Sequence, residues 1–296
     1  MTIHDPLSLP VAAFSTKELR RTVRLERKRA DLIDLFGEPV PEALAWAYPQ
    51  SAVDRARAAG VQRKYLSREA NIARSWNRVQ TYLPELIRPG GASDVLEMST
   101  GHGAMLEVLR HLGHTVLGTD YANMVFKLEA SPQAQERRIG DTTFVRRVDD
   151  AGRSFSDADV VRGPYASIVD AIGIHVRPVD GGAPPYPFAD DSFDTVMAFQ
   201  ALDHYCHPAD WPKVLDEFCR IARYSVVILL NRLTTELSAR SGYADAFDTA
   251  RTAFRNFDAR GFRCVSVKVH YGAALGFKFM RLSDGKDLAG RRRSTF

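Results

Sequence analysis

Short apolar runs alternate with amphipathic segments from about residue 92 to residue 282. The runs carry apolar residues at consecutive positions, a pattern typical of strands that are buried on both faces of a sheet. Five strands of this kind are predicted, at 94–98, 115–120, 172–180, 193–199 and 225–231. Two further runs, 263–271 and 276–282, flank a small-residue turn, and this predicts an antiparallel hairpin at the edge of the sheet.

Amphipathic segments fill the intervals between the predicted strands. Helices are expected at 104–114, 164–173 and 211–223, where apolar residues recur at helical spacing. Strands that alternate with helices form parallel strand–helix–strand units. The pattern therefore predicts an α/β fold, with a doubly wound and mostly parallel sheet of seven strands once the hairpin is included.

The first 91 residues predict a helical N-terminal cap. Segment 15–37 opens with Ser15 three residues before Glu18, which is the capping-box spacing. Its arginines are either a solvated helix face or an anion-binding face: Arg20, Arg21, Arg24, Arg27 and Arg29. Segment 68–87 carries an apolar stripe that we expect to pack on the main domain: Ile72, Trp76, Val79, Leu83 and Leu86. The sequence RPGG at 88–91 predicts the boundary, so that 92–296 forms the second domain.

Residues 121–173 are too many for a single helical crossover. The segment is polar and punctuated by glycines. Long insertions in compact domains are often lids or binding loops. We expect either a lid over a ligand site or an insertion without a role in binding.

Composition places the chain among soluble globular proteins. Its 296 residues are 45% hydrophobic and 26% charged, and the net charge of +4 says little by itself about nucleic acid. The three cysteines lack metal-ligand spacing and predict reduced thiols, with no metal site, in a cytoplasmic protein. No signal peptide and no run long enough to span a bilayer are predicted. The oligomeric state stays open.

The turn Ser99–Gly103 lies between the first two predicted strands and is built of small residues. Small residues let the backbone approach a ligand, and the following helix offers unpaired N–H groups. Asp120 ends the next strand, where a carboxylate can bind both ribose hydroxyls. Leu106 occupies the position of the third glycine of the dinucleotide fingerprint, which argues against NAD. Glu97 precedes the turn and favours a cationic ligand over a pyrophosphate.

Three stretches of the chain together resemble a known family. VLEMSTGHGAM at 95–105, VLGTDYA at 116–122 and PVDGGAPPYPFADDSFDTVMAFQALDHY at 178–205 are similar to the class I S-adenosylmethionine-dependent methyltransferases, in particular to the group that acts on small molecules and saccharides. The resemblance covers about 94–224 apart from the insertion, and it implies a Rossmann-like methyltransferase fold. Ser99 stands where this family usually has the first glycine of the loop.

The resemblance implies a cofactor site for S-adenosylmethionine. Glu97 and the backbone of the turn would bind the methionine end, Asp120 the ribose, and Asp180 the adenine amino group. The positions expected to bind the cofactor are Glu97, Ser99, Gly101, His102, Gly103, Asp120, Tyr121, Asp180, Gly181 and Gln200.

The stretch FQALDHY at 199–205 follows the fourth predicted strand, near the expected position of the methyl group. His204 is the candidate general base, because histidine titrates near neutrality, and Asp203 or Tyr205 would orient or replace it. The alternative is a structural histidine at a helix start. His175 is expected to be a core residue of its strand.

The sequence thus predicts a methyltransferase that modifies an oxygen or nitrogen of a polar small molecule or a saccharide. The motifs of enzymes that methylate exocyclic base amines or cytosine carbon are missing from 199–210, which argues against those nucleic-acid substrates. Three alternatives remain at this point: a non-catalytic cofactor-binding regulator on the same fold, an RNA methyltransferase, and an NAD-dependent enzyme.

Overall fold

The computed structural model of the chain describes the cap from residue 38 onward and most of the second domain. The described residues are 38–87, 91–120, 134–139, 142–147, 164–270 and 274–282. Four predicted features lie wholly or mostly outside these residues: the helix at 15–37 with its arginines, the boundary at 88–91, Tyr121 and the insertion.

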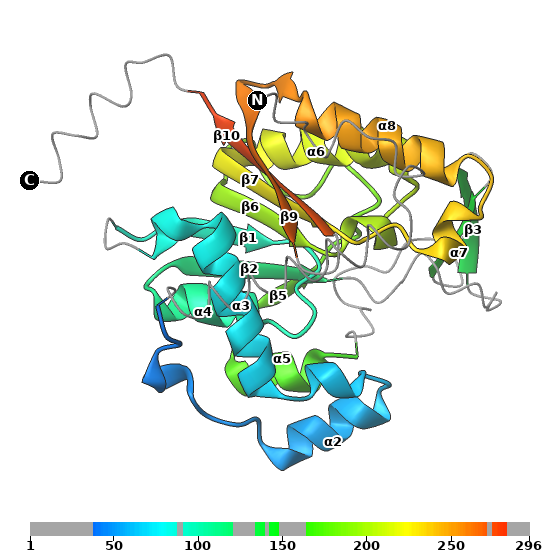
Figure 1. The fold of residues 1–296 in the computed structure, drawn as a ribbon. Helices are drawn as coiled ribbons and strands as arrows, with labels where there is room; N and C mark the ends of the chain where they lie inside the picture. The colour runs from blue at the N-terminus through cyan, green and yellow to red at the C-terminus, as the bar shows by residue number, and fades with distance from the viewer. Residues whose placement is uncertain are drawn as a thin grey trace, which may run out of the picture.

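One sheet organises the described part of the chain (Figure 1). Its eight strands follow the order β5-β2-β1-β6-β7-β10-β9-β8. Their bounds are β1 Asp94–Glu97, β2 Thr115–Asp120, β5 Val176–Pro178, β6 Phe193–Phe199, β7 Ala222–Leu230, β8 Asp258–Ala259, β9 Phe262–His270 and β10 Ala274–Arg281. The first five strands in this order are parallel, while β10 is antiparallel to both β7 and β9.

The doubly wound, mostly parallel sheet is confirmed, and so is the antiparallel β9–β10 pair. The count differs by one strand, since β8 pairs with β9 over only two residues and gives no apolar run in the sequence. The hairpin also inserts differently from the prediction. Strand β10 lies inside the sheet, and β8 rather than the hairpin forms the edge.

Neighbouring residues of the central strands pack on opposite faces of the sheet. Leu96 and Val196 contact the layer formed by α6 (Trp211–Ile221) and α8 (Tyr243–Arg255). Val95 and Met197 contact the other layer, formed by α3 (Arg68–Tyr82), α4 (Ala104–His111) and α5 (Ala166–Ile172). Figure 1 shows the two helical layers on either side of the sheet. Burial on both faces explains why these strands are continuously apolar.

The described part of the cap packs on the second of these layers through α3. All five residues of the predicted apolar stripe are buried there: Ile72, Trp76, Val79, Leu83 and Leu86. The side chain of Ser67 caps α3 by accepting a hydrogen bond from Ala70 N at 3.2 Å. α2 (Gln50–Ala58) packs on α5. The cap thus shares the core of the sheet, and the division of the chain at residue 91 stays a prediction.

A buried ion pair joins the cap to α4, the helix that follows the turn Ser99–Gly103, which we call the cradle turn. The Arg68 guanidinium, at the start of α3, pairs with the Glu107 carboxylate on α4, and both side chains are almost completely buried. Arg68 also lies over the ring of Trp46, 3.7 Å from its centroid. Buried charges are tolerated when they are paired in this way, and removal of one partner is costly.

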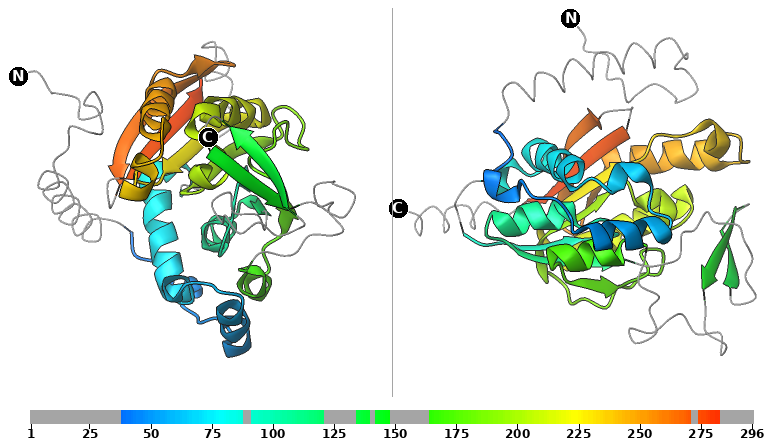
Figure 2. Two further views of the ribbon diagram at one scale, coloured as in Figure 1. Left: turned by 90° about the vertical axis from the view of Figure 1, so that its right-hand side faces the viewer. Right: turned by 90° about the horizontal axis from the view of Figure 1, so that it is seen from below.

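The predicted insertion contains two strands and a helix among its described residues. β3 (Ala134–Ile139) and β4 (Thr142–Arg147) pair antiparallel in a sheet of their own, apart from the main sheet (Figure 2). α5 begins at Ala166 and is the crossover helix that leads into β5. The extra length therefore belongs to the residues before α5, and a lid role for them stays a prediction.

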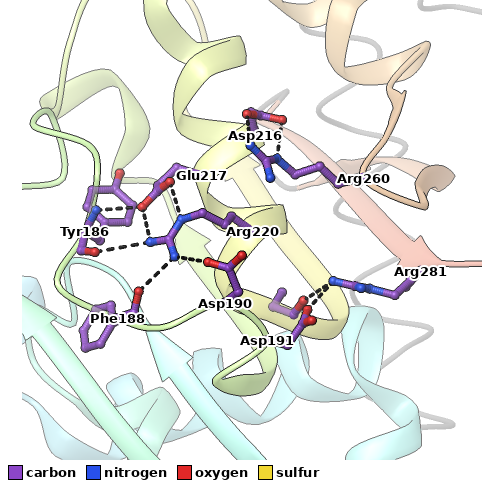
Figure 3. A network of polar contacts seen from close by, with 10 residues as sticks. Tyr186, Phe188, Asp190, Asp191, Asp216, Glu217, Arg220, Arg260 and Arg281 are labelled. Carbon is purple, nitrogen blue, oxygen red and sulfur yellow. Dashed lines mark hydrogen bonds and ion pairs between the residues drawn. The ribbon is translucent and has the colours of Figure 1, made fainter.

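The loop between β5 and β6 is fixed by Arg220 of α6 (Figure 3). Its guanidinium donates to Glu217 Oε2 at 2.8 Å, to Phe188 O at 2.9 Å and to Asp190 Oδ1 at 2.6 Å. Glu217 in turn accepts a hydrogen bond from Tyr186 N at 2.7 Å. This network holds the loop that follows the predicted adenine-binding residues against α6.

Within the described ranges, no helix has the length and apolar character that crossing a membrane requires.

Candidate functional site at the carboxyl edge of the sheet

The carboxyl ends of four neighbouring strands bring the predicted site residues to one edge. Glu97 ends β1, Asp120 ends β2, Gln200 follows β6 and Asn231 follows β7. Because these strands are adjacent and parallel, their ends meet. The sequence predicted the first three of these residues as one site, and the edge also includes Asn231.

The cradle turn depends on three residues with positive φ. Ser99 has φ 56°, Gly101 55° and Gly103 73°. Serine therefore adopts the left-handed conformation that favours glycine, at the position where the resembling family has glycine. A Cβ atom on Gly103 would lie 2.8 Å from Ile172 Cδ1, so this glycine allows α4 and α5 to approach. Gly101 N donates to Asp120 Oδ2 at 3.2 Å, which ties the turn to β2.

Glu97 is an acid in an apolar position. Its side chain is buried, with the residue 5% exposed, and Oε2 has no hydrogen-bond partner in the described part of the chain. Burial raises the pKa of Glu97 to about 8, the nearby Asp120 adds to this, and Arg78 opposes it. A buried carboxyl oxygen that lacks a partner marks a position where a ligand with a hydrogen-bond donor or a positive charge would be stabilised.

Arg78 brings the cap to this edge. It lies on α3, its guanidinium donates to Gln200 Oε1, and it lies 5.4 Å from the centroid of the Phe199 ring. Burial lowers the pKa of Arg78, and the charge of Glu97 counteracts this. Arg78 is not among the site residues predicted from the sequence. Its spacing of four residues from Arg74, which places both on one face of a helix, was an available signal.

A chain of hydrogen bonds continues from Arg78 across the strand ends. Gln200 has φ 56° and donates through Nε2 to Asn231 Oδ1 at 3.1 Å. Asn231 Nδ2 donates to both oxygens of Asp203, at 2.8 and 3.0 Å. Asn231 was also missed, although a polar residue directly after a buried strand is the signal that identified Asp120. These hydrogen bonds hold the Asp203 carboxyl in one orientation.

Asp203 and His204 lie together on a 3₁₀ turn, Leu202–His204, directly after β6. His204 Nε2 is 3.7 Å from Asp203 Oδ2, and the histidine side chain is 39% exposed whereas that of Asp203 is 10% exposed. Burial raises the pKa of Asp203, while His204 and Asn231 counteract the increase. An accessible imidazole backed by a buried carboxyl is an arrangement suited to moving protons.

Tyr205, Asp180 and Gly181 lie together at the other end of the edge. Tyr205 is buried, and its ring packs so tightly on Gly181 that a Cβ there would lie 2.8 Å from the ring atoms. Asp180 Oδ1 accepts a hydrogen bond from Gly182 N at 2.8 Å. Burial holds the pKa of Tyr205 well above its usual value. Tyr205 is thus packed into the core, unlike the accessible His204.

His102 belongs to an aromatic cluster over the cradle turn. Its ring centroid is 5.6 Å from Tyr65 of the cap and 6.4 Å from Tyr165, which precedes α5. Its Nδ1 accepts a hydrogen bond from Ala104 N at 3.3 Å, at the start of α4. Burial lowers the pKa of His102 to about 3, and Arg74 and Arg78 add to this, so the ring is neutral. The other histidine, His175, is exposed beside the edge strand β5, and its prediction as a core residue is wrong.

Residues 164–230 match the protein family described as methyltransferase domain. Over these residues the chain contains a methyltransferase domain. Its matched segment runs from the residues before α5 to the end of β7 and includes Asp180, Gln200, Asp203 and His204. Among curated proteins, none matches this chain.

Solved methyltransferase structures resemble this chain at low sequence identity. A S-adenosylmethionine-dependent methyltransferase from Aquifex aeolicus is 16% identical with a TM-score of 0.37, and the match covers 69% of this chain and 93% of the other. Magnesium protoporphyrin IX methyltransferase from Synechocystis PCC 6803, solved with bound S-adenosylhomocysteine, is 13% identical with a TM-score of 0.44, and the match covers 78% and 95% of the two chains.

The residues at the edge fit the cofactor of this enzyme class. Glu97 offers a buried oxygen without a partner to an ammonium group, and the cradle turn presents backbone at positive φ beside the carboxylate of Asp120. Both features suit a ligand that carries an ammonium group and a ribose. Tyr121, also predicted to bind the cofactor, lies outside the described residues.

Proposed function

We propose that this enzyme transfers the methyl group of S-adenosylmethionine to an oxygen or nitrogen of a polar small molecule or a saccharide, with oxygen favoured. The observation that carries the proposal is the partly exposed His204 side chain next to the buried Asp203 carboxyl, one strand away from Glu97. A hydroxyl of high pKa needs its proton removed during attack, and this pair provides a base for that purpose.

The cradle residues would hold the cofactor in an orientation that directs its methyl group toward the pair. Glu97 would bind the ammonium group, the backbone of Ser99–Gly103 the methionine end, Asp120 the ribose, and Asp180 with Gly181 the adenine. The sulfonium supplies an activated methyl group for in-line displacement. The contribution of the chain is therefore alignment of the acceptor and removal of its proton.

Within the pair, the roles follow from exposure. The His204 side chain is partly exposed and its Nε2 faces Asp203, so its Nδ1, which is buried in this structure, would have to take the proton from the acceptor hydroxyl. Asp203 is buried and held by Asn231, so it would orient the imidazole and stabilise its charged form. Gln200 and Arg78 would stiffen this arrangement from the cap side. Tyr205, packed on Gly181, would shape the floor of the site.

His204→Ala tests the proposal, with the exposed His175→Ala as a matched control. Methyl transfer from labelled S-adenosylmethionine would be measured against phenols, alcohols, amines and sugars, beside calorimetry with S-adenosylhomocysteine. For an oxygen acceptor, kcat should fall about 10²–10⁴-fold in His204→Ala with cofactor affinity unchanged. His175→Ala should match the unmodified enzyme. Activity within a few-fold of the original would exclude an essential base at His204 and point to an amine or an acidic oxygen. Loss of cofactor binding would instead make His204 structural.

A further inference from the structure

Arg74 lies on the same face of α3 as Arg78, one turn closer to its N-terminus. Its guanidinium donates to the Asn71 side-chain oxygen and to Lys64 O at 3.2 Å, both of them neutral acceptors. Within the described ranges it pairs with no carboxylate. A partly buried arginine that has only neutral partners keeps its full charge available to an anionic ligand.

The surroundings of Arg74 form a basic and aromatic wall over the cradle turn. Its guanidinium carbon lies 5.5 Å from the centroid of the Tyr65 ring, and Lys64 Nζ lies 4.7 Å from the same centroid. The same ring also lies near His102, with ring centroids 5.6 Å apart, and near Tyr165, with ring centroids 6.0 Å apart. The wall therefore continues from the cap to the turn that we propose binds the methionine end of the cofactor.

The electrostatic balance on this side of the turn is positive. Arg74 is the first of the two cations that lower the pKa of His102, which places its charge close to the turn. Lys64 and Arg78 add to the same field. Two carboxyl groups lie at the strand ends beside the turn: Asp120 accepts a hydrogen bond from Gly101 N, and Glu97 is the acid that Arg78 faces. A surface lined by positive charges attracts anions and repels cations.

We propose that Arg74, assisted by Lys64, forms an anion-binding subsite that recognises a carboxylate or phosphate group on the methyl acceptor, with Tyr65 as the apolar surface beside it. This inference rests on the proposed function and adds a substrate class to it: an acidic small molecule, bound with its anionic group toward the cap and its reacting atom toward His204. A guanidinium can bind either anion through two parallel hydrogen bonds.

Binding of small probes to the full chain saturated with S-adenosylhomocysteine tests the subsite without requiring turnover. The probes are 4-hydroxybenzoate, the neutral 4-hydroxybenzamide of nearly the same shape, phenyl phosphate and inorganic phosphate, each measured by calorimetry. The anionic aromatic probes should bind at least about tenfold more tightly than the amide. The carboxylate and phosphate arms show which anion is preferred, and binding of inorganic phosphate as tightly as phenyl phosphate would mean that the apolar surface contributes nothing.

Arg74→Gln should remove the preference for the anionic probes, and Arg74→Lys should retain part of it. The matched control is Arg63→Gln, which removes an exposed positive charge from the same part of the cap and should leave the preference intact. Thermal unfolding identifies any variant that is not folded. Three outcomes would contradict the subsite. The unmodified chain could bind 4-hydroxybenzoate and 4-hydroxybenzamide with equal affinity, or bind no anionic probe at 10 mM. Alternatively, Arg63→Gln could lose as much of the preference for anionic probes as Arg74→Gln. Weakened S-adenosylhomocysteine binding in Arg74→Gln would overturn it too, by assigning Arg74 to the cofactor. Failure of the unmodified chain to bind S-adenosylhomocysteine would instead refute the proposed cofactor site.

Discussion

The two halves of the carboxyl edge are built in different ways. The cradle half comes from a nearly continuous stretch, Glu97 to Gly103, with Asp120 at the end of the next strand. The other half is assembled from three separate segments: Arg78 of the cap, Gln200 and Asp203 after β6, and Asn231 after β7. The first half relies on backbone conformation, and the second relies on side chains that reach each other across the fold.

This difference separates what each half requires. A turn with three positive φ angles is specified locally and forms wherever the flanking strands are in place. The series of hydrogen bonds from Arg78 to Asp203 forms only when α3 packs on the sheet. The backbone of the cradle turn should therefore tolerate changes in the cap, whereas Glu97, which faces Arg78, and the half proposed to move a proton should not.

The buried ion pair that joins α3 of the cap to α4 after the cradle turn should give the largest effect. Glu107→Ala leaves the Arg68 guanidinium buried without its partner, and the free energy of unfolding should fall by about 3–5 kcal/mol in urea denaturation. Replacing both partners, by Arg68→Met with Glu107→Leu, should restore most of that loss. A loss below about 1 kcal/mol in Glu107→Ala would show that the pair does not anchor the cap.

Asp120→Ala is directed at the cradle half. The Gly101 N–H and the expected ribose hydroxyls would lose their carboxylate acceptor, so S-adenosylhomocysteine should bind more weakly by about 1–3 kcal/mol in calorimetry. The exposed Asp245→Ala removes the same charge elsewhere and serves as the control. Unchanged affinity in Asp120→Ala would contradict the ribose assignment.

The pH dependence of cofactor binding distinguishes Glu97 from the exposed acids. With its pKa raised to about 8, Glu97 of the free enzyme is protonated at pH 7. An ammonium group requires the carboxylate, so binding releases a proton below pH 8. Affinity for S-adenosylhomocysteine should rise about tenfold per pH unit up to that point and level off above it. Glu97→Gln should bind weakly and without this slope. The same slope in Glu97→Gln would assign it to another group.

The smallest expected effect concerns the local geometry of the turn. Ser99→Gly should remove about 1–2 kcal/mol of backbone strain from the folded state, because glycine adopts the left-handed conformation without a steric penalty. It should also cost about 0.5–1 kcal/mol, because glycine loses more conformational entropy on folding. The net stabilisation should be within about 1 kcal/mol by thermal unfolding. Ser99→Val, with a branched side chain at positive φ, should be destabilised instead. If the valine variant is as stable as the original, the turn is not confined to the left-handed conformation.

The parts of the molecule that follow from local pattern could be predicted from the sequence. The predicted 193–199 strand coincides with β6, and the apolar stripe from Ile72 to Leu86 is buried as expected, because both are set by consecutive or periodic apolar residues. β8 could not be predicted, since two residues carry no period. Arg78 escaped prediction because its contact with Gln200 spans 122 residues of chain, and Asn231 because its contacts with Gln200 and Asp203 span 31 and 28 residues. The local signals at both positions do not specify these partners.

Arg78 has a consequence for how this enzyme could be recombined or inherited. The cation closest in effect to the buried acid of the cradle belongs to α3, which precedes the first strand of the sheet. A chimera that exchanges the cap while keeping the sheet would leave Glu97 and Gln200 without that guanidinium unless the new cap carries a cation at the same place. The cap is thus an integral part of the catalytic unit rather than an exchangeable module, and residues 38–87 would be expected to vary together with 97 and 200 in any lineage that preserves this edge.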